Sequence, residues 1–144
     1  MPTVVHQPPA AAPGKRHPLA LTVTLPATTA SAGIARSAVT AALHRHGLDR
    51  FALVACLAVT ELAACAARTA PDTAIHIELA EYERGLRLLA HSAQPAAPCT
   101  RRGLWLLSAA IDDWGGTWGV LDTHARPHTH TPPSRTLTWI GLPH

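Results

Sequence analysis

The sequence predicts an α+β fold, a two-layer sandwich in which three helices cover one face of a mixed, mostly antiparallel sheet. Strand-like alternation of apolar and polar residues occurs in five short segments, four of which form two hairpins. Helical periodicity occurs in three longer segments, two of which follow one another directly. The longest of these, 51–67, is apolar on nearly all sides, which is typical of a helix in the middle of a core.

The composition fits one globular domain. The chain has 144 residues, a hydrophobic content of 47% and a formal charge of +3. Such a mild basic excess, with no long basic run, does not favour nucleic-acid binding. The three cysteines lack a C-x-x-C spacing, so we expect reduced thiols in the cytoplasm. No signal peptide is recognisable, and 51–67 is too short and too acidic at its centre for a membrane span.

The first third of the chain holds a leader, a strand and a helix. Residues 1–18 are rich in proline and alanine, which predicts a disordered leader, and the folded domain is expected over 19–143. Alternation predicts a strand over 19–25, and a helix follows over 30–46. We expect a threonine, Thr28 or Thr29, to cap this helix at its start and Gly47 to close it.

The central helix and the first hairpin come next. The helix is predicted over 49–68, with Asp49 as its cap and Pro71 stopping it shortly after its end. Strands are predicted over 74–80 and 86–91, joined by a turn, so they form an antiparallel pair. The proline-containing segment 92–100 is expected to be a loop or lid.

The last third repeats the pattern of helix and hairpin. A helix is predicted over 102–113 and strands over 117–121 and 135–142, where Leu137 and Trp139 alternate with Thr136 and Thr138. The insert between these strands carries His124, His128 and His130. Prolines break this insert, so it fixes no coordination geometry, and we predict no metal site there.

Glu61 is the one carboxylate of the apolar helix. A carboxylate there is costly unless it is paired, hydrogen-bonded or facing a wet pocket. Arg68 lies only about 20° away around the helix but two turns along it, roughly 10 Å, so a direct ion pair would be strained. We therefore favour the hypothesis that Glu61 faces a pocket.

Two segments carry a resemblance to a known family. Residues 60–68, TELAACAAR, and residues 102–107, RGLWLL, occur in the order and spacing of the histidine-kinase-like ATPase superfamily. Within it the chain looks most like the small anti-sigma-factor serine kinases, ATP-binding regulators of transcription. The resemblance implies the Bergerat-type ATPase fold and ATP as ligand. It also implies a protein partner, a sigma factor or an anti-anti-sigma-type protein, and leaves a homodimer open.

On the central helix the resemblance assigns a base and a metal ligand. In the family a Glu acts as general base, and an Asn four residues later holds the Mg²⁺ that bridges the phosphates. Glu61 matches the base, whereas Cys65 stands in the place of the Asn. A thiol is a poor ligand for Mg²⁺, so the resemblance implies ATP binding with doubtful Mg²⁺ binding and no metal residue. Arg68, at the end of the same segment, is included among the expected nucleotide contacts.

The adenine motif of the family is altered in this sequence. The family places an Asp at the end of the first hairpin to bind the adenine amino group, and here His91 and Ser92 occupy that place.

The family's lid motif, Gly-Arg-Gly-Leu, which receives phosphate at a helix start, is also altered. Arg102, Gly103 and Leu104 match it, and Arg101 replaces the first Gly. Two adjacent arginines at a helix start still favour an anion.

Two functions remain open on the sequence. One is an ATP-binding regulatory domain whose nucleotide site is impaired, and whether it retains protein serine kinase activity is not decided. The alternative is a non-catalytic protein-interaction module that regulates a partner without ATP. For the first we expect Glu61, Cys65, His91 and Gly103 to line one cavity between the central helix, the hairpin end and the 92–101 loop.

Overall fold

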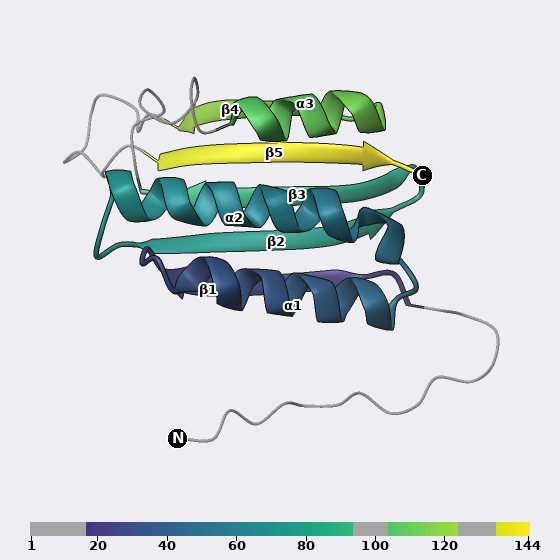
Figure 1. Ribbon diagram of the computed structural model, residues 1–144, viewed down its shortest axis with the longest axis horizontal. Coiled ribbons are helices and arrows are strands. Elements are labelled where there is room, and N and C mark those ends of the chain that lie inside the picture. The colour runs from purple at the N-terminus through teal and green to yellow at the C-terminus, as the bar shows by residue number, and fades with distance from the viewer. Residues whose placement is uncertain (1–16, 94–103, 124–134) are drawn as a thin grey trace, which may run out of the picture.

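A computed structural model of the chain describes residues 17–93, 104–123 and 135–144. Three α-helices and five strands follow the predicted order (Figure 1). They are β1 (Ala20–Pro26), α1 (Ser31–Arg45), the 3₁₀ turn η1 (Asp49–Phe51), α2 (Ala52–Thr69), β2 (Ala74–Tyr82), β3 (Gly85–Ser92), α3 (Trp105–Trp114), β4 (Thr117–Thr123) and β5 (Arg135–Pro143). Residues 1–16 of the expected leader, residues 94–103, which include most of the expected loop and the expected start of the third helix, and residues 124–134 of the insert lie outside the described residues.

The described strands form one five-stranded sheet in the order β1-β2-β3-β5-β4. Every neighbouring pair of these strands is antiparallel, so the sheet is antiparallel throughout rather than mixed. The three helices lie side by side on one face, with α2 between α1 and α3 (Figure 1). The α+β class and the two-layer arrangement are thus confirmed, and the other face of the sheet carries none of the described helices.

Two helices end at a glycine, and the one at Gly47 was predicted. Gly47 has a φ of 68°, and the amide of Leu48 donates to the carbonyl of Leu43 over 2.8 Å. At the end of α3, Gly115 has a φ of 80°, and the amide of Gly116 donates to the carbonyl of Ile111 over 2.9 Å. Both are Schellman motifs, in which glycine adopts the left-handed conformation without a Cβ penalty.

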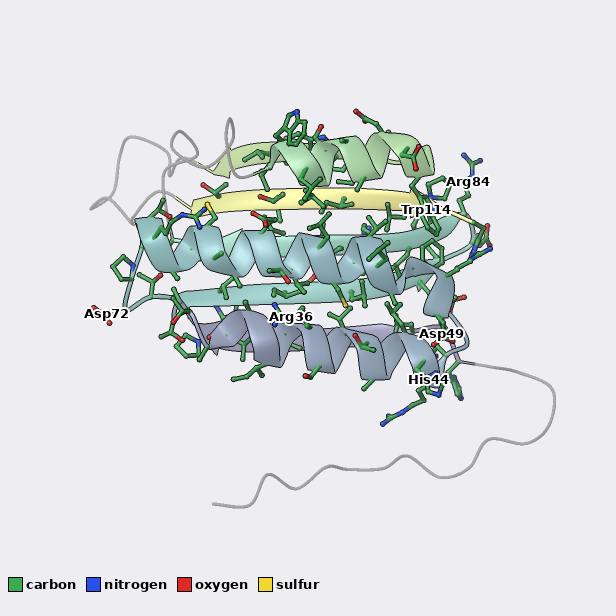
Figure 2. The ribbon with its side chains drawn as sticks, in the orientation of Figure 1. Arg36, His44, Asp49, Asp72, Arg84 and Trp114 are labelled. Carbon is green, nitrogen blue, oxygen red and sulfur yellow. The ribbon has the colours of Figure 1, made fainter. Side chains whose placement is uncertain are left out.

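The predicted N-terminal caps are wrong. The N-cap of α1 is Ala30, and no side chain caps the helix. Asp49 does not cap α2 either, because its carboxylate binds the Nδ1 of His44 at 2.8 Å (Figure 2). Both partners of that pair are well exposed, and surface pairs of this kind contribute little to stability.

α2 is the central helix of the core, as expected. It contributes eight buried residues, against four from α1 and two from α3. Among the described residues, Asp49–Thr69 is the one helical segment long and apolar enough to cross a membrane, with a mean hydropathy of 1.8. Half of that window is buried within the fold.

The strand registers decide which side chains face the helices. On β2 the apolar residues Ile75, Ile77 and Leu79 are buried, while His76 and Glu78 are exposed on the open face of the sheet. On β5 the buried set includes two polar residues, Thr136 and Thr138, while Leu137 and Trp139 face the open side and are only half-buried. The polar threonines of β5 therefore occupy positions that apolar residues hold on β2.

Candidate functional site

Glu61 lies on the edge of the buried face of α2. At about 100° per residue, the buried residues of this helix span one side of it, and the half-buried Glu61 marks one border of that side. Its carboxylate makes no ion pair within the described part of the chain, so the pairing with Arg68 is not formed. Arg68 is exposed on the same side, two turns closer to the end of the helix.

The opposite flank of α2 faces α1. The guanidinium of Arg36 donates from Nη1 to the hydroxyl of Thr60 over 3.2 Å, and Figure 2 shows Arg36 between the two helices. The thiol of Cys56 lies 3.2 Å from the hydroxyl of Thr40 on the same flank. Glu61 is about 100° around the helix from Thr60. Since α2 lies between α1 and α3 (Figure 1), Glu61 lies on the flank that is turned toward α3.

Cys65 lies one turn beyond Glu61, about 40° further into the core, and its side chain is buried. It is disulfide-bonded, while Cys56 is a free thiol. The expectation of reduced cysteines therefore fails at this position. A disulfide sulfur has no oxygen to offer Mg²⁺, which binds hard oxygen ligands. The place that the resemblance assigns to a metal-binding Asn is thus occupied by a group unsuited to that ion.

The disulfide can be checked by thiol counting. We expect the folded chain to react with fewer equivalents of Ellman's reagent before reduction than after reduction, because only free thiols react. Cys56→Ser should remove one reactive thiol from the unreduced chain, since Cys56 is the free cysteine. A count of three in the unreduced, denatured chain, equal to the number of cysteines in the sequence, would contradict the disulfide at Cys65.

Hydroxyl groups gather on the helix-facing side of the sheet, at the end where β3 stops and β5 begins. Ser92 and Thr136 are paired across these strands, and the residue two further along β5 is Thr138. Ser92 pairs on its other side with Ile75, which is buried beneath the helices, so its side chain belongs to that face. Thr138 is only 6% exposed, and its hydroxyl makes no hydrogen bond within the described part of the chain.

The last turns of α2 and these hydroxyl groups lie at the same end of the sandwich. Only residues 70–73 separate the end of α2 from the start of β2, and β2 begins beside Ser92, the last residue of β3. Cys65 and Arg68 are in the last two turns of α2, so they lie at this end too. The structure thus places Cys65, Arg68, Ser92 and the β5 threonines, from distant parts of the sequence, toward the same end of the sandwich.

His91 does not belong to this group, which corrects the expectation of one cavity lined by Glu61 and His91. It is paired directly with His76, and His76 is exposed on the open face of the sheet. Opposed residues of an antiparallel pair share one face. The sheet itself therefore lies between His91 and Glu61, and Ser92 is the residue at the hairpin end that faces the helices.

The start of α3 was expected to bind phosphate, and the structure describes it from Leu104 onward. Leu104 is the N-cap of α3, and its side chain is buried in the core, so only its main chain is positioned to meet a ligand. Arg101, Arg102 and Gly103, the expected phosphate contacts, lie outside the described residues.

The arrangement offers a carboxylate, neutral hydroxyls and an exposed cation, and no cluster of metal ligands. No group of three or more His, Cys, Asp or Glu side chains that could hold a metal ion occurs in the described ranges. Thr138 was not expected at a site. Its signal in the sequence is a threonine at an alternating strand position, which does not reveal the buried face by itself.

No protein-family model matches the chain, and no curated protein matches it. The class that fold and site define is therefore an α+β two-layer sandwich with a polar end between α2, α3 and the sheet.

Proposed function

We propose that this chain is a regulatory domain of the histidine-kinase-like, Bergerat-type ATPase fold, with an impaired nucleotide site. The observation that carries the proposal is the grouping at one end of the sandwich. Glu61 and Cys65 share the flank of α2 that is turned toward α3, and the sheet beneath this end presents Ser92 and Thr136. In this proposal a nucleotide lies between α2 and α3.

The described residues fit parts of a nucleotide. Ser92, Thr136 and Thr138 provide hydroxyls that can donate to or accept from a base or ribose in a partly buried setting. The hydroxyl of Thr138, which lacks a partner among the described residues, is the best indication that something polar is accommodated there. Glu61 takes the place of the general base, and the phosphates would meet the start of α3 together with Arg68, Arg101, Arg102 and Gly103.

The same residues explain why the site is impaired. The sequence has no carboxylate at the place where the family binds adenine. The carboxylates within 73–111 are Glu78, Glu81 and Glu83, and these belong to the hairpin and its turn. The Mg²⁺ ligand is replaced by the disulfide-bonded Cys65. Each lost contact of this kind costs about 1.5–3 kcal/mol, so a micromolar affinity falls toward the millimolar range. We therefore expect turnover as a protein serine kinase to be weak or absent.

A protein partner completes the proposal. It is a sigma factor or an anti-anti-sigma-type protein, recognised in the cytoplasm, so that the domain regulates transcription by contact. In that reducing compartment the Cys65 disulfide would be reduced to a thiol, which supplies no oxygen ligand for Mg²⁺ either. Regulation without ATP, by a non-catalytic interaction module, is the second candidate. It is favoured by apolar side chains exposed on the helix layer, above all Leu53 at 81% and Trp105 at 72%.

The test is calorimetry with ATP and GTP, with and without Mg²⁺. We expect the native chain to bind both nucleotides with affinities in the millimolar range, with little effect of Mg²⁺. Raising the salt concentration should weaken binding, because exposed charge contacts are screened. Cys65→Asn should introduce Mg²⁺ dependence, since an amide oxygen then stands on the flank of Glu61.

The control is Cys65→Ala, which also removes the disulfide but supplies no oxygen ligand, so it should gain no Mg²⁺ dependence. Tight, Mg²⁺-dependent and ATP-selective binding by the native chain would show that the site is intact. Absence of binding by every variant at millimolar nucleotide would reject the nucleotide site and leave the interaction module.

A further inference from the structure

We propose that His76 and His91 form a two-histidine binding site for a divalent transition-metal ion on the open face of the sheet. The site is independent of the nucleotide proposal, because it lies on the side of the sheet away from the helices. Its ligands would be two imidazole nitrogens, with water in the remaining positions. Imidazole suits Cu²⁺, Ni²⁺ and Zn²⁺ and is a poor match for Mg²⁺ or Ca²⁺.

The strand register places the two imidazoles opposite one another. His76 of β2 is the direct partner of His91 of β3 in the antiparallel ladder. Opposed side chains have Cβ atoms about 4.5–5.5 Å apart on the same face. One imidazole nitrogen from each ring can therefore reach a single ion at the usual distance of about 2.0–2.1 Å. The backbone ladder holds this pair in place, so little ordering is needed on binding.

A hydrogen bond orients one of the rings. The Nδ1 of His76 lies 2.8 Å from the hydroxyl oxygen of Thr24, its partner on the other side in β1. When Nδ1–H donates to this hydroxyl, the lone pair of Nε2 is free for a metal ion. Metal-binding histidines commonly use such a partner to fix the tautomer and the ring orientation.

The surroundings leave room for an ion and its waters. A hollow of about 180 Å³ is lined by both histidines together with Ala74, Ala93 and Ser92, the last residue of β3, whose side chain belongs to the opposite face of the sheet. The three lining residues other than the histidines are small, so none of them fills the space in front of the rings. Glu78 is exposed two residues along β2, on the same face, and its negative charge favours a cation nearby.

The test measures thermal unfolding with and without NiCl₂. The sequence contains ten histidines, so metal binding alone would not identify the site. The opposed pair exists only in the folded sheet, however, and an ion bound there stabilises the fold by mass action. We expect 1 mM Ni²⁺ to raise the Tm of the native chain by on the order of 5 °C.

Matched variants locate the effect. His76→Gln and His91→Gln should each abolish the rise in Tm, because one imidazole alone holds the ion weakly. His44→Gln on α1 and the triple variant His124→Gln/His128→Gln/His130→Gln should retain it. Thr24→Val should leave the metal-free Tm nearly unchanged, since Thr24 is exposed, and weaken the Ni²⁺ affinity by about tenfold or more.

A second measurement uses the native chain alone. Substoichiometric Cu²⁺ should broaden the ring resonances of His76 and His91 together in NMR spectra. A Tm unaffected by Ni²⁺, or a rise that survives in His76→Gln or His91→Gln, would overturn the proposal. So would Cu²⁺ broadening that leaves both rings unaffected.

Discussion

Phe51→Ala is expected to lower the free energy of unfolding by about 3–5 kcal/mol, the range for truncating a large buried aromatic residue. Phe51 is 0% exposed and ends the η1 turn just before α2. Its ring centroid lies 5.2 Å from that of Trp114, the last residue of α3, and the guanidinium of Arg50 lies 4.8 Å above its centre. Because the ring joins the start of α2 to the end of α3, its removal leaves a cavity between two helices.

Urea unfolding followed by circular dichroism would measure this loss. Leu53→Ala is the matched control, because Leu53 is two residues further along the chain, in the first turn of α2, but 81% exposed. We expect that variant to stay within about 0.5 kcal/mol of the native chain. A loss below about 1 kcal/mol for Phe51→Ala would show that Phe51 does not hold the two helices together.

Gly85→Ala is expected to cost about 3 kcal/mol or more, for two reasons that add. Gly85 begins β3 with a φ of 152°, a backbone conformation that residues other than glycine rarely adopt. A Cβ atom there would also lie 1.9 Å from the carbonyl oxygen of Leu142 and 2.8 Å from the Cα of Pro143. Both contacts are with the backbone of β5, so relief requires a shift of the strand itself.

Gly115→Ala separates these two causes. Gly115 also has a positive φ, 80°, but nothing lies within 4 Å of an added Cβ. We expect that variant to lose only about 1–2 kcal/mol, the cost of the left-handed conformation alone. Equal losses for the two variants in the same urea experiment would show that the close approach of β3 to β5 contributes nothing.

The helices and strands were predictable because local features define them. The apolar periodicity of α2, the alternation of Ile75, Ile77 and Leu79 and the glycines after α1 and α3 all act over a few residues. The caps were the exception. Asp49 had the right residue type and position for a cap, but its carboxylate binds His44 on the preceding helix instead.

The candidate site was predictable only in part. The spacing of Glu61 and Cys65 correctly predicted that they share one flank of the helix. Ser92, next to His91 in the sequence, was expected at the same site as His91. The strand register instead points the two residues to opposite faces, since successive side chains of a strand alternate.

By itself, therefore, the sequence determined the order of the elements, the central place of α2 and the antiparallel hairpins. The tertiary structure alone decided which face each strand residue occupies, because pairing between strands far apart in sequence depends on register over the whole sheet. This is why Thr136 and Thr138 are buried while Trp139 faces the open side. It is also why His76 and His91, fifteen residues apart in the sequence, stand opposite one another.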